Sequence, residues 1–359
     1  MKEVEFKDLV SGMILARNIC DLKKNVIFPE GYVLTSKAIT KLSFYTVSSI
    51  FVEEHKIDEV SSMFSGHRPY SHLVKRSPEF QRFAKDFERD VYKFRDHIND
   101  VVERNAPIDI QDLMRDTLAL LDNARGKIHI FEILYNMRQY DDSTYAHSIN
   151  VALICNVLAT WLHMSKEDVF LATQCGLLHD IGKLKIPEYI IKKPSRLTDE
   201  EYNIVKTHPL AGHDILNVYH LDPHIPHAAL MHHERCDGTG YPFGLTGDKI
   251  DRFAKIVSIA DVYDAMTSSR VYRHGLCPFK VISILEKEGF QKYDTEIILT
   301  FLQNVLDGYI LNLVRLSDGR IGEVILINRS ALSRPLIKCG TDYVDLSLEP
   351  PELYIDSIL

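Results

Sequence analysis

Apolar residues recur at three- and four-residue steps through the middle of the chain, which places them on one face of a helix. This spacing predicts helices over residues 77–102 and 109–124 and through most of 140–305. Both ends of the chain instead carry short β-type runs separated by glycine turns, as in residues 25–31 and 311–328. We therefore expect a mainly α protein: an all-helical central domain, a small α+β module before it and a small β appendix after it.

These changes of pattern divide the chain into four parts. Residues 1–65 form the α+β module, with a regulatory or structural role, and residues 66–125 form a helical connector or a dimerisation segment, so that we expect a homodimer. Residues 126–307 carry nearly all of the chemically suggestive histidines and are the candidate catalytic domain. Residues 308–359 form the β appendix, in which a turn at 317–320 joins two strands of a predicted hairpin.

Composition narrows the class of protein. The chain has 359 residues, 45% of them hydrophobic and 26% charged, which is typical of a globular protein. A formal net charge of −8 opposes a broad DNA- or RNA-binding surface, so any phosphate recognition must be local. The chain has no apolar run long enough for a membrane span, no signal core and no Cys-x-x-Cys pair among its six cysteines. We expect a cytoplasmic protein.

The most informative stretch is His-His-Glu-Arg-Cys-Asp-Gly-Thr-Gly-Tyr-Pro at residues 232–242. Neutral imidazoles are good ligands for first-row metals, and His232 and His233 are adjacent. For this block alone, a surface histidine pair is an equally good interpretation, because most histidines are partly buried polar side chains without a metal. The decision depends on the remaining histidines and aspartates.

Two further candidates lie on predicted helices. His147 opens a helix on the same face as Val151, Ile154 and Leu158, where a core histidine is the alternative. An apolar helix ends in His179-Asp180, with Gly182 expected as its left-handed C-terminal cap. Burial of a polar group without a partner costs roughly 2–7 kcal/mol, so this aspartate needs a cation or a helix to cap.

Three segments complete the pattern. A capping-box sequence at residues 198–201 starts a helix that leads to His208-Pro209, where the proline ends it or starts the next one. A short helix over 226–233 delivers His232 and His233. The helix from Arg252 to Met266 places Asp261 and Asp264 on an apolar face, where an acidic residue needs a partner.

In order and approximate spacing these residues resemble the HD-GYP phosphodiesterases of the HD superfamily. The likeness covers about residues 126–305 and includes the blocks 232–242 and 259–268. It implies an HD-type catalytic domain in which one metal ion is held by His147, His179 and Asp261, a second by His208, His232 and His233, and Asp180 bridges the two. The resemblance suggests iron or manganese, whereas nitrogen and carboxylate donors alone would equally suit Co, Ni or Zn.

The number of metals depends on one position. Some HD-GYP members carry a glutamate four residues before the first histidine that recruits a third metal, but this chain has Ser143 there. We therefore expect two divalent metal ions. Asp141 and Asp142 lie beside it and leave open a third, loosely held ion.

A metal pair of this kind predicts phosphodiester hydrolysis. Two cations about 3.5–4 Å apart lower the pKa of a bridging water and neutralise phosphate charge. By resemblance, the reaction opens cyclic di-GMP to linear pGpG, or onward to GMP, by a metal-bridging hydroxide in bacterial second-messenger signalling. Asp180 and Lys183 are the expected catalytic residues, with Lys183 reaching the substrate phosphate; the alternative is a cation that interacts with a helix end.

The remaining candidates would contact substrate. Guanidinium groups match phosphate oxygens and stack on purines, so Arg270 and Arg273 are expected to contact the substrate. Lys183, Asp264 and Tyr241 are further expected substrate contacts, and the ring of Tyr241 would pack on a guanine. Gly238, Gly240 and Pro242 would let the loop approach the ligand. A rigid turn or a docking loop for other signalling proteins is as good an interpretation of Gly240-Tyr241-Pro242.

Two alternative functions stay open. Residue spacing does not distinguish cyclic di-GMP from cyclic di-AMP or a mixed cyclic dinucleotide. A chain that binds a cyclic dinucleotide with little turnover, as a sensor or scaffold, is a function of another class. The presence of every expected core ligand opposes it, because degenerate sensors should have lost one.

Overall fold

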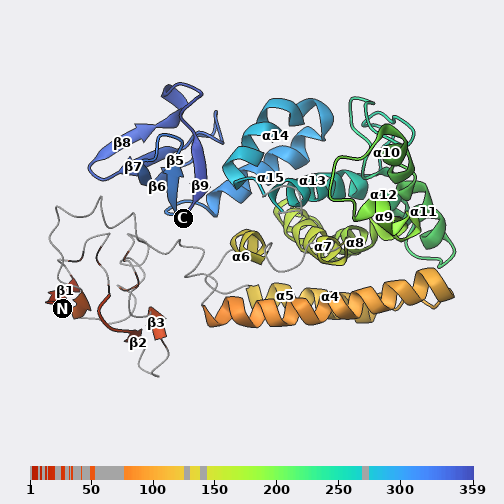
Figure 1. Ribbon diagram of the computed structural model, residues 1–359, viewed down its shortest axis with the longest axis horizontal. Helices are drawn as coiled ribbons and strands as arrows, with labels where there is room; N and C mark the ends of the chain where they lie inside the picture. The colour runs from red at the N-terminus through yellow and green to blue at the C-terminus, as the bar shows by residue number, and fades with distance from the viewer. Residues whose placement is uncertain are drawn as a thin grey trace.

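The computed structural model describes residues 77–124, 130–137, 144–268 and 275–359, together with residues 2–6, 9, 13, 15–20, 26–28, 32, 34, 42 and 49–52. Helices occupy the middle of the molecule and one end, and strands occupy the other end (Figure 1). In sequence, four of the described strands precede the helical part of the chain and five follow it. This arrangement confirms the mainly α fold with small β structures near both ends of the chain.

The first 52 residues contribute two short strand pairs. β1 (Lys2–Glu5) pairs with β4 (Ser49–Val52), and β2 (Ile19–Cys20) pairs with β3 (Val26–Phe28), both antiparallel. Their buried side chains, among them Leu15 and Phe28, form a hydrophobic cluster separate from the main one.

A long helix and its neighbour follow. α4 (Pro78–Arg104) is capped by Ser77, whose hydroxyl accepts a hydrogen bond from the amide N–H of Phe80 at 3.1 Å. The helix buries a stripe of phenylalanines. α5 (Ile110–Ala124) packs back against it, and α6 (Ile130–Met137) comes next. The predicted helices at 77–102 and 109–124 are therefore confirmed.

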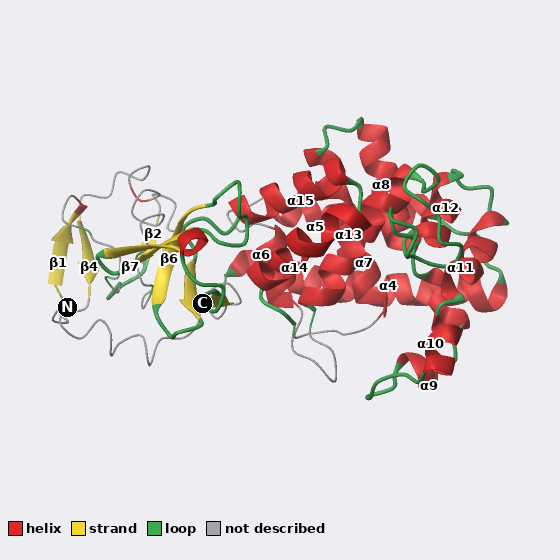
Figure 2. Ribbon diagram, turned by 90° about the horizontal axis from the view of Figure 1, so that it is seen from above, coloured by secondary structure: helices red, strands yellow, loops and turns green. Residues whose placement is uncertain are grey.

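The helical domain is built around α7 (Thr144–Trp161), α8 (Lys166–Leu178) and α13 (Arg252–Thr267), which contact one another. Between α8 and α13 the chain forms η3 (Ile181–Lys185), α9 (Glu188–Ile191), α10 (Asp199–Val205), α11 (His208–Asn217) and α12 (His224–Met231). α9 and α10 project from the body (Figure 2). α14 (Pro278–Lys292) and α15 (Thr295–Asp307) complete the domain. Within the described ranges, no helix has the length and apolar character needed to cross a membrane.

The chain ends in a five-stranded antiparallel sheet of order β8-β7-β6-β5-β9. Its strands are β5 (Leu313–Leu316), β6 (Ile321–Leu326), β7 (Leu336–Cys339), β8 (Asp342–Asp345) and β9 (Ile355–Ile358), with the short helix η4 (Leu346–Leu348) between the last two. β5 and β6 form the predicted hairpin, with Arg315 opposite Ile321.

The sheet is joined to the helices by one continuous core. Phe301 and Tyr309 belong to the same hydrophobic cluster as Val314 and Val324 of the sheet. The buried Asn312 side chain donates to a Glu132 carboxylate oxygen on α6 at 2.8 Å. On α14, the Glu286 carboxylate accepts two amide N–H groups, at 2.6 and 2.9 Å, from the β6–β7 connection. The expected boundary between residues 307 and 308 therefore falls inside a shared core.

Candidate metal centre

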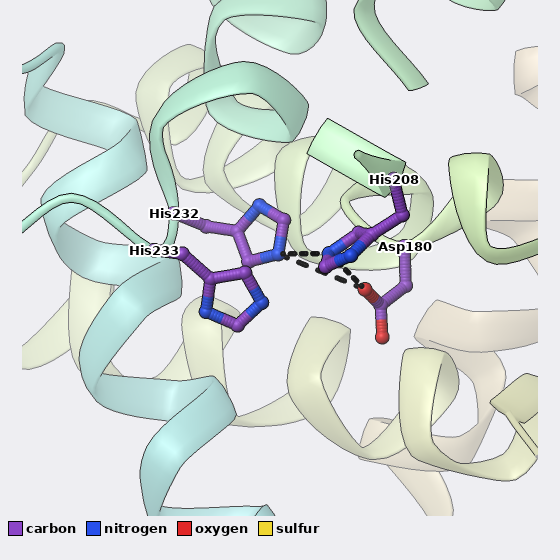
Figure 3. A group of neighbouring side chains, drawn as sticks. All are labelled: Asp180, His208, His232 and His233. Atoms are coloured by element: carbon purple, nitrogen blue, oxygen red, sulfur yellow. Dashed lines mark hydrogen bonds and ion pairs between the residues drawn. The ribbon is translucent and has the colours of Figure 1, made fainter. Parts of the chain in front are cut away.

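Five segments deliver the predicted ligands to one place. His147 lies in the first turn of α7, His179 and Asp180 follow the end of α8, His208 begins α11 with Pro209 beside it, His232 and His233 follow α12, and Asp261 lies within α13. The structure gathers all seven into two groups, within each of which the ligand atoms lie within 4.8 Å of one another. The first group is His147, His179 and Asp261, and the second is Asp180, His208, His232 and His233 (Figure 3).

Asp180 lies between the two groups. Its Oδ2 is 3.3 Å from Nε2 of His179 and 3.7 Å from Nε2 of His147, both in the first group. Its Oδ1 is 3.4 Å from Nε2 of His208 and 3.6 Å from Nε2 of His232, both in the second (Figure 3). Each oxygen thus faces a different set of histidines, which is the geometry that a bridging carboxylate needs.

Gly182 explains how His208 reaches Asp180, and here the sequence prediction is wrong. α8 ends at Leu178, and Gly182 is not a left-handed cap but lies within the 3-10 helix η3. A Cβ on Gly182 would overlap with the His208 carbonyl and the Gly212 backbone. The absence of a side chain lets α11 approach η3 closely, and this contact places His208 against the segment that begins with Asp180.

Burial and neighbouring groups shift the pKa values of Asp180, His208 and His232. His179, Asp180, His208 and His232 are each at most 1% exposed. Burial lowers the pKa of His208 to about 3 and lowers the pKa of His232 below its ordinary value. Burial alone would raise the pKa of Asp180, but interactions with His179 and Lys183 hold that pKa well below the ordinary value. Neutral imidazoles beside an ionised carboxylate are the forms that bind metals.

Two of the candidate ligand atoms lack a hydrogen-bond partner. In the described part of the chain, Nε2 of His179 and Oδ1 of Asp180 are buried without a hydrogen bond. Nε2 of His208 and Nε2 of His232 lie 3.3 Å apart. Both rings are neutral because burial lowers their pKa, so this contact is not an attraction between charges. Buried polar atoms are nearly always paired in proteins, so converging lone pairs of this kind fit bound cations.

His147 is held by two aspartates. Its Nε2 lies 3.0 Å from Asp261 and its Nδ1 lies 2.7 Å from Oδ2 of Asp264. Burial would lower the pKa of His147, but both carboxylates outweigh it and raise the pKa to about 9. The sequence predicts a substrate contact for Asp264, whereas this side chain is 1% exposed and contacts the imidazole of His147. Helical periodicity placed it on the face of Asp261 but could not show its direction.

The other predicted residues have different places. Lys183 is 20% exposed, with Nζ 2.5 Å from Oδ2 of Asp180. The Tyr241 ring stacks on His233, with centroids 4.6 Å apart. Gly238 has φ +79, and the Tyr241-Pro242 peptide bond is cis. The remaining predictions concern Asp141, Asp142, Ser143, Arg270 and Arg273, which lie outside the described residues.

Sequence reasoning missed the role of Glu234. Its carboxylate is 2% exposed, and its two oxygens accept the amide N–H groups of Phe243 and Leu245 at 2.8 and 2.9 Å. An acidic residue directly after two candidate ligands was the available signal. The amide groups that it would accept from lie nine and eleven residues away, and no local pattern identifies them.

Comparison with known proteins places this site in a family. The profile of the HD domain matches residues 126–297. This segment is an HD domain. This chain is similar to a cyclic di-GMP phosphodiesterase of Pseudomonas aeruginosa, at 36% identity over 206 residues, 57% of this chain and 50% of the relative. It is also similar to the 3'3'-cGAMP-specific phosphodiesterase 1 of Vibrio cholerae, at 35% identity over 171 residues, 47% of this chain and 40% of the relative.

A solved structure supports the fold. An HDGYP protein from Bdellovibrio bacteriovorus aligns over 85% of this chain and 99% of its own, with a TM-score of 0.50 and 16% identity. The chain spans half or less of the length of the curated relatives named above. The profile match over residues 126–297 confirms the expected relationship to the HD superfamily for this segment, and the solved structure agrees with its fold.

Proposed function

We propose that this chain is a metal-dependent phosphodiesterase that opens cyclic di-GMP to linear pGpG. The observation that carries the proposal is the position of Asp180, a buried, ionised carboxylate whose two oxygens face two separate groups of metal-type ligands. The relatives of this chain include a cyclic di-GMP phosphodiesterase that is 36% identical over the matched segment. Both the ligands and the likeness therefore support the same class of reaction.

His147, His179 and Asp261 would hold one cation, His208, His232 and His233 the other, and Asp180 both. Iron or manganese is the proposed metal, because imidazole and carboxylate ligands without thiolate suit either. When bound, two such cations supply an acidified water and neutralise charge on the phosphate. Asp264 would keep the imidazole of His147 in the orientation that the first cation needs.

Lys183 has the position of a phosphate-binding residue. Its ammonium group lies beside Asp180 and is partly exposed, so it can reach a phosphate oxygen at the edge of the site. In the reaction a water oxygen forms a bond to phosphorus while the bond from phosphorus to the ribose oxygen breaks. The leaving oxygen then takes a proton, for which Lys183 is the candidate donor. Arg270 and Arg273 remain candidates for the second phosphate or the base.

Another cyclic dinucleotide is the second candidate substrate. The similarity to a 3'3'-cGAMP-specific phosphodiesterase is at nearly the same level of identity, so the matched segment alone does not select the base. A sensor with little turnover is less well supported, because all seven expected ligands are present and converge. A homodimer formed through α4 and α5 stays a prediction.

The test is to purify the protein anaerobically, measure metal per chain, and follow products from cyclic di-GMP, cyclic di-AMP and 3'3'-cGAMP. Asp180→Ala should abolish turnover and lower the metal content. Asp214→Ala is the matched control, because Asp214 is an aspartate with a side chain 81% exposed. A content of two metals per chain, together with faster cleavage of cyclic di-GMP than of the other two nucleotides, would support the proposal. Undiminished hydrolysis in Asp180→Ala would overturn the mechanism, and nucleotide binding without metal or turnover would establish a sensor.

A further inference from the structure

Four of the five histidines at the centre are fixed by a hydrogen bond that the ring nitrogen facing away from the metal group donates. Nδ1 of His179 lies 2.7 Å from the Gly176 carbonyl, and Nδ1 of His208 lies 2.7 Å from the Val205 carbonyl. Nδ1 of His232 lies 2.9 Å from the Ala229 carbonyl. The fourth is His147, held by Asp264 as described above. Such bonds fix the tautomer and orientation of a ligating imidazole.

His233 is the exception. Over the described ranges its ring makes no hydrogen bond, and the nearest charged partner of its Nδ1 is Oδ2 of Asp261 at 3.8 Å. Its ring is in contact with those of His232 and His208, at centroid distances of 4.1 and 5.0 Å. These neighbours are themselves candidate ligands. Something else must hold the imidazole of His233 in place.

The Tyr241 ring also contacts the imidazole of His233. It stacks on His233 with ring centroids 4.6 Å apart and an angle of 26° between the planes. The main chain reinforces this contact, because the amide N–H of Tyr241 donates to the His233 carbonyl at 3.2 Å. Tyr241 is therefore tied to the same residue through both its backbone and its side chain.

Two features keep the loop against the ligand segment. The Glu234 carboxylate accepts the amide N–H groups of Phe243 and Leu245, so it closes the loop around Tyr241. A Cβ on Gly240 would overlap with the backbone of Glu234 and Arg235, and only glycine allows the two segments to lie this close. The loop is thus fastened to the residue that follows His233.

We propose that Tyr241 is a positioning residue for His233: its stacked ring does for this imidazole what hydrogen bonds do for the other four. Glu234 and Gly240 hold Tyr241 in that place. The inference rests on the proposed metal-dependent function, since it assigns Tyr241 to the second cation. It also separates Tyr241 from the two other roles considered for it, a platform for a guanine base and a docking site for a partner protein.

The test uses the full chain freed of metal by chelation and titrated anaerobically with Mn²⁺. Tyr241→Phe keeps the stacked ring and should bind two Mn²⁺ as the unmodified protein does. Tyr241→Leu removes it, and the affinity for one Mn²⁺ should fall roughly tenfold to a hundredfold while the other is unchanged. The electron paramagnetic resonance signal of a coupled Mn²⁺ pair should weaken in parallel. Tyr343→Leu is the matched control, because Tyr343 is 60% exposed on β8 of the C-terminal sheet.

A second variant keeps the test valid if Tyr241→Leu folds poorly. Glu234→Gln retains the size of the side chain but can accept only one of the two amide N–H groups through its single oxygen. Its affinity for one Mn²⁺ should fall in the same direction, by less than in Tyr241→Leu. Circular dichroism melts of both variants would separate a loss of metal from a loss of fold.

Each other result has a defined meaning. If Tyr241→Leu and Glu234→Gln bind two Mn²⁺ with unchanged affinity, the inference is wrong. A raised KM for cyclic di-GMP in that case would assign Tyr241 to the substrate, and an unchanged KM would leave the loop to a protein partner. If the unmodified protein binds fewer than two Mn²⁺, the proposed function fails and this inference fails with it.

Discussion

Replacing Asp264 by Asn should weaken the first metal site in a way that depends on pH. The carboxylate is almost fully buried and its Oδ2 lies 2.7 Å from Nδ1 of His147, so its charge acts on the ring with little screening by solvent. Asn keeps the shape and an acceptor oxygen but removes the charge. Mutation of a residue that orients a metal ligand typically lowers metal affinity by about 10- to 100-fold. For Asp264→Asn we expect a loss of about tenfold, which corresponds to about 1.4 kcal/mol of binding free energy.

Protons change the size of this effect. The pKa of His147 is raised to about 9, so at pH 7 the metal-free ring is mostly protonated and must lose a proton before a cation binds. Proton competition then costs the unmodified protein about 100-fold in affinity at pH 7, falling by about tenfold per pH unit up to the pKa. Asp264→Asn removes one of the two carboxylates that raise this pKa, so its competition is weaker. The variant's deficit should be small at pH 6.5 and should grow toward pH 8.5.

The assay is an anaerobic Mn²⁺ titration against a competing chelator at several pH values between 6.5 and 8.5. The control is Ser268→Ala, which removes a hydroxyl that donates to the same carboxylate oxygen at 3.3 Å and leaves the charge in place. Parallel pH dependences for Asp264→Asn and the unmodified protein, with equal affinities at pH 8.5, would refute the role assigned to Asp264.

Further predictions concern the reaction and the fold. Lys183→Met should slow hydrolysis by about 100-fold while both metals are retained, as measured by product analysis. The control variant Lys185→Met should keep nearly the rate of the unmodified protein. Equal rates for the two variants would show that Lys183 takes no part in the reaction. Asn312→Ala should lower the free energy of unfolding in urea by about 2 kcal/mol, because the buried Glu132 carboxylate loses a hydrogen bond; a change under about 0.5 kcal/mol would show that this bond does not join the sheet to the helices. Ser77→Ala should cost about 1 kcal/mol in the same assay through loss of the α4 N-cap, and no loss would mean that the first turn of α4 contributes nothing to the global fold.

Helical periodicity accounts for most of what the sequence predicts correctly. The apolar face of α7 includes the position of His147, and the apolar face of α13 includes that of Asp261, so both were expected to point inward. The hairpin of β5 and β6 followed from two apolar runs around a Gly319 turn. These features depend on residues close in sequence, and a local pattern is enough to detect them.

Other features depend on contacts between distant segments. The role of Gly182 arises because α11 approaches it from 26 residues further along the chain, and a glycine near a helix end is ordinarily interpreted as a cap. The direction of Asp264 depends on His147, 117 residues away. The stack of Tyr241 on His233 depends on a loop conformation that the motif does not encode in a periodic way. The sequence identifies candidate site residues, but the contacts of Asp264 with His147 and of Tyr241 with His233 depend on the tertiary structure.

The core shared by α15 and the C-terminal sheet limits how this chain can be recombined. A cut after Asp307 would separate Phe301 and Leu302 from Val314 and Val324, all of which are buried in one cluster. A graft of the helical domain onto another effector must therefore take the sheet with it. The strands before residue 53 have a separate hydrophobic cluster among the described residues, so exchange on that side disturbs less packing. In evolution or in design, replacement of a neighbouring module is easier before α4 than after α15.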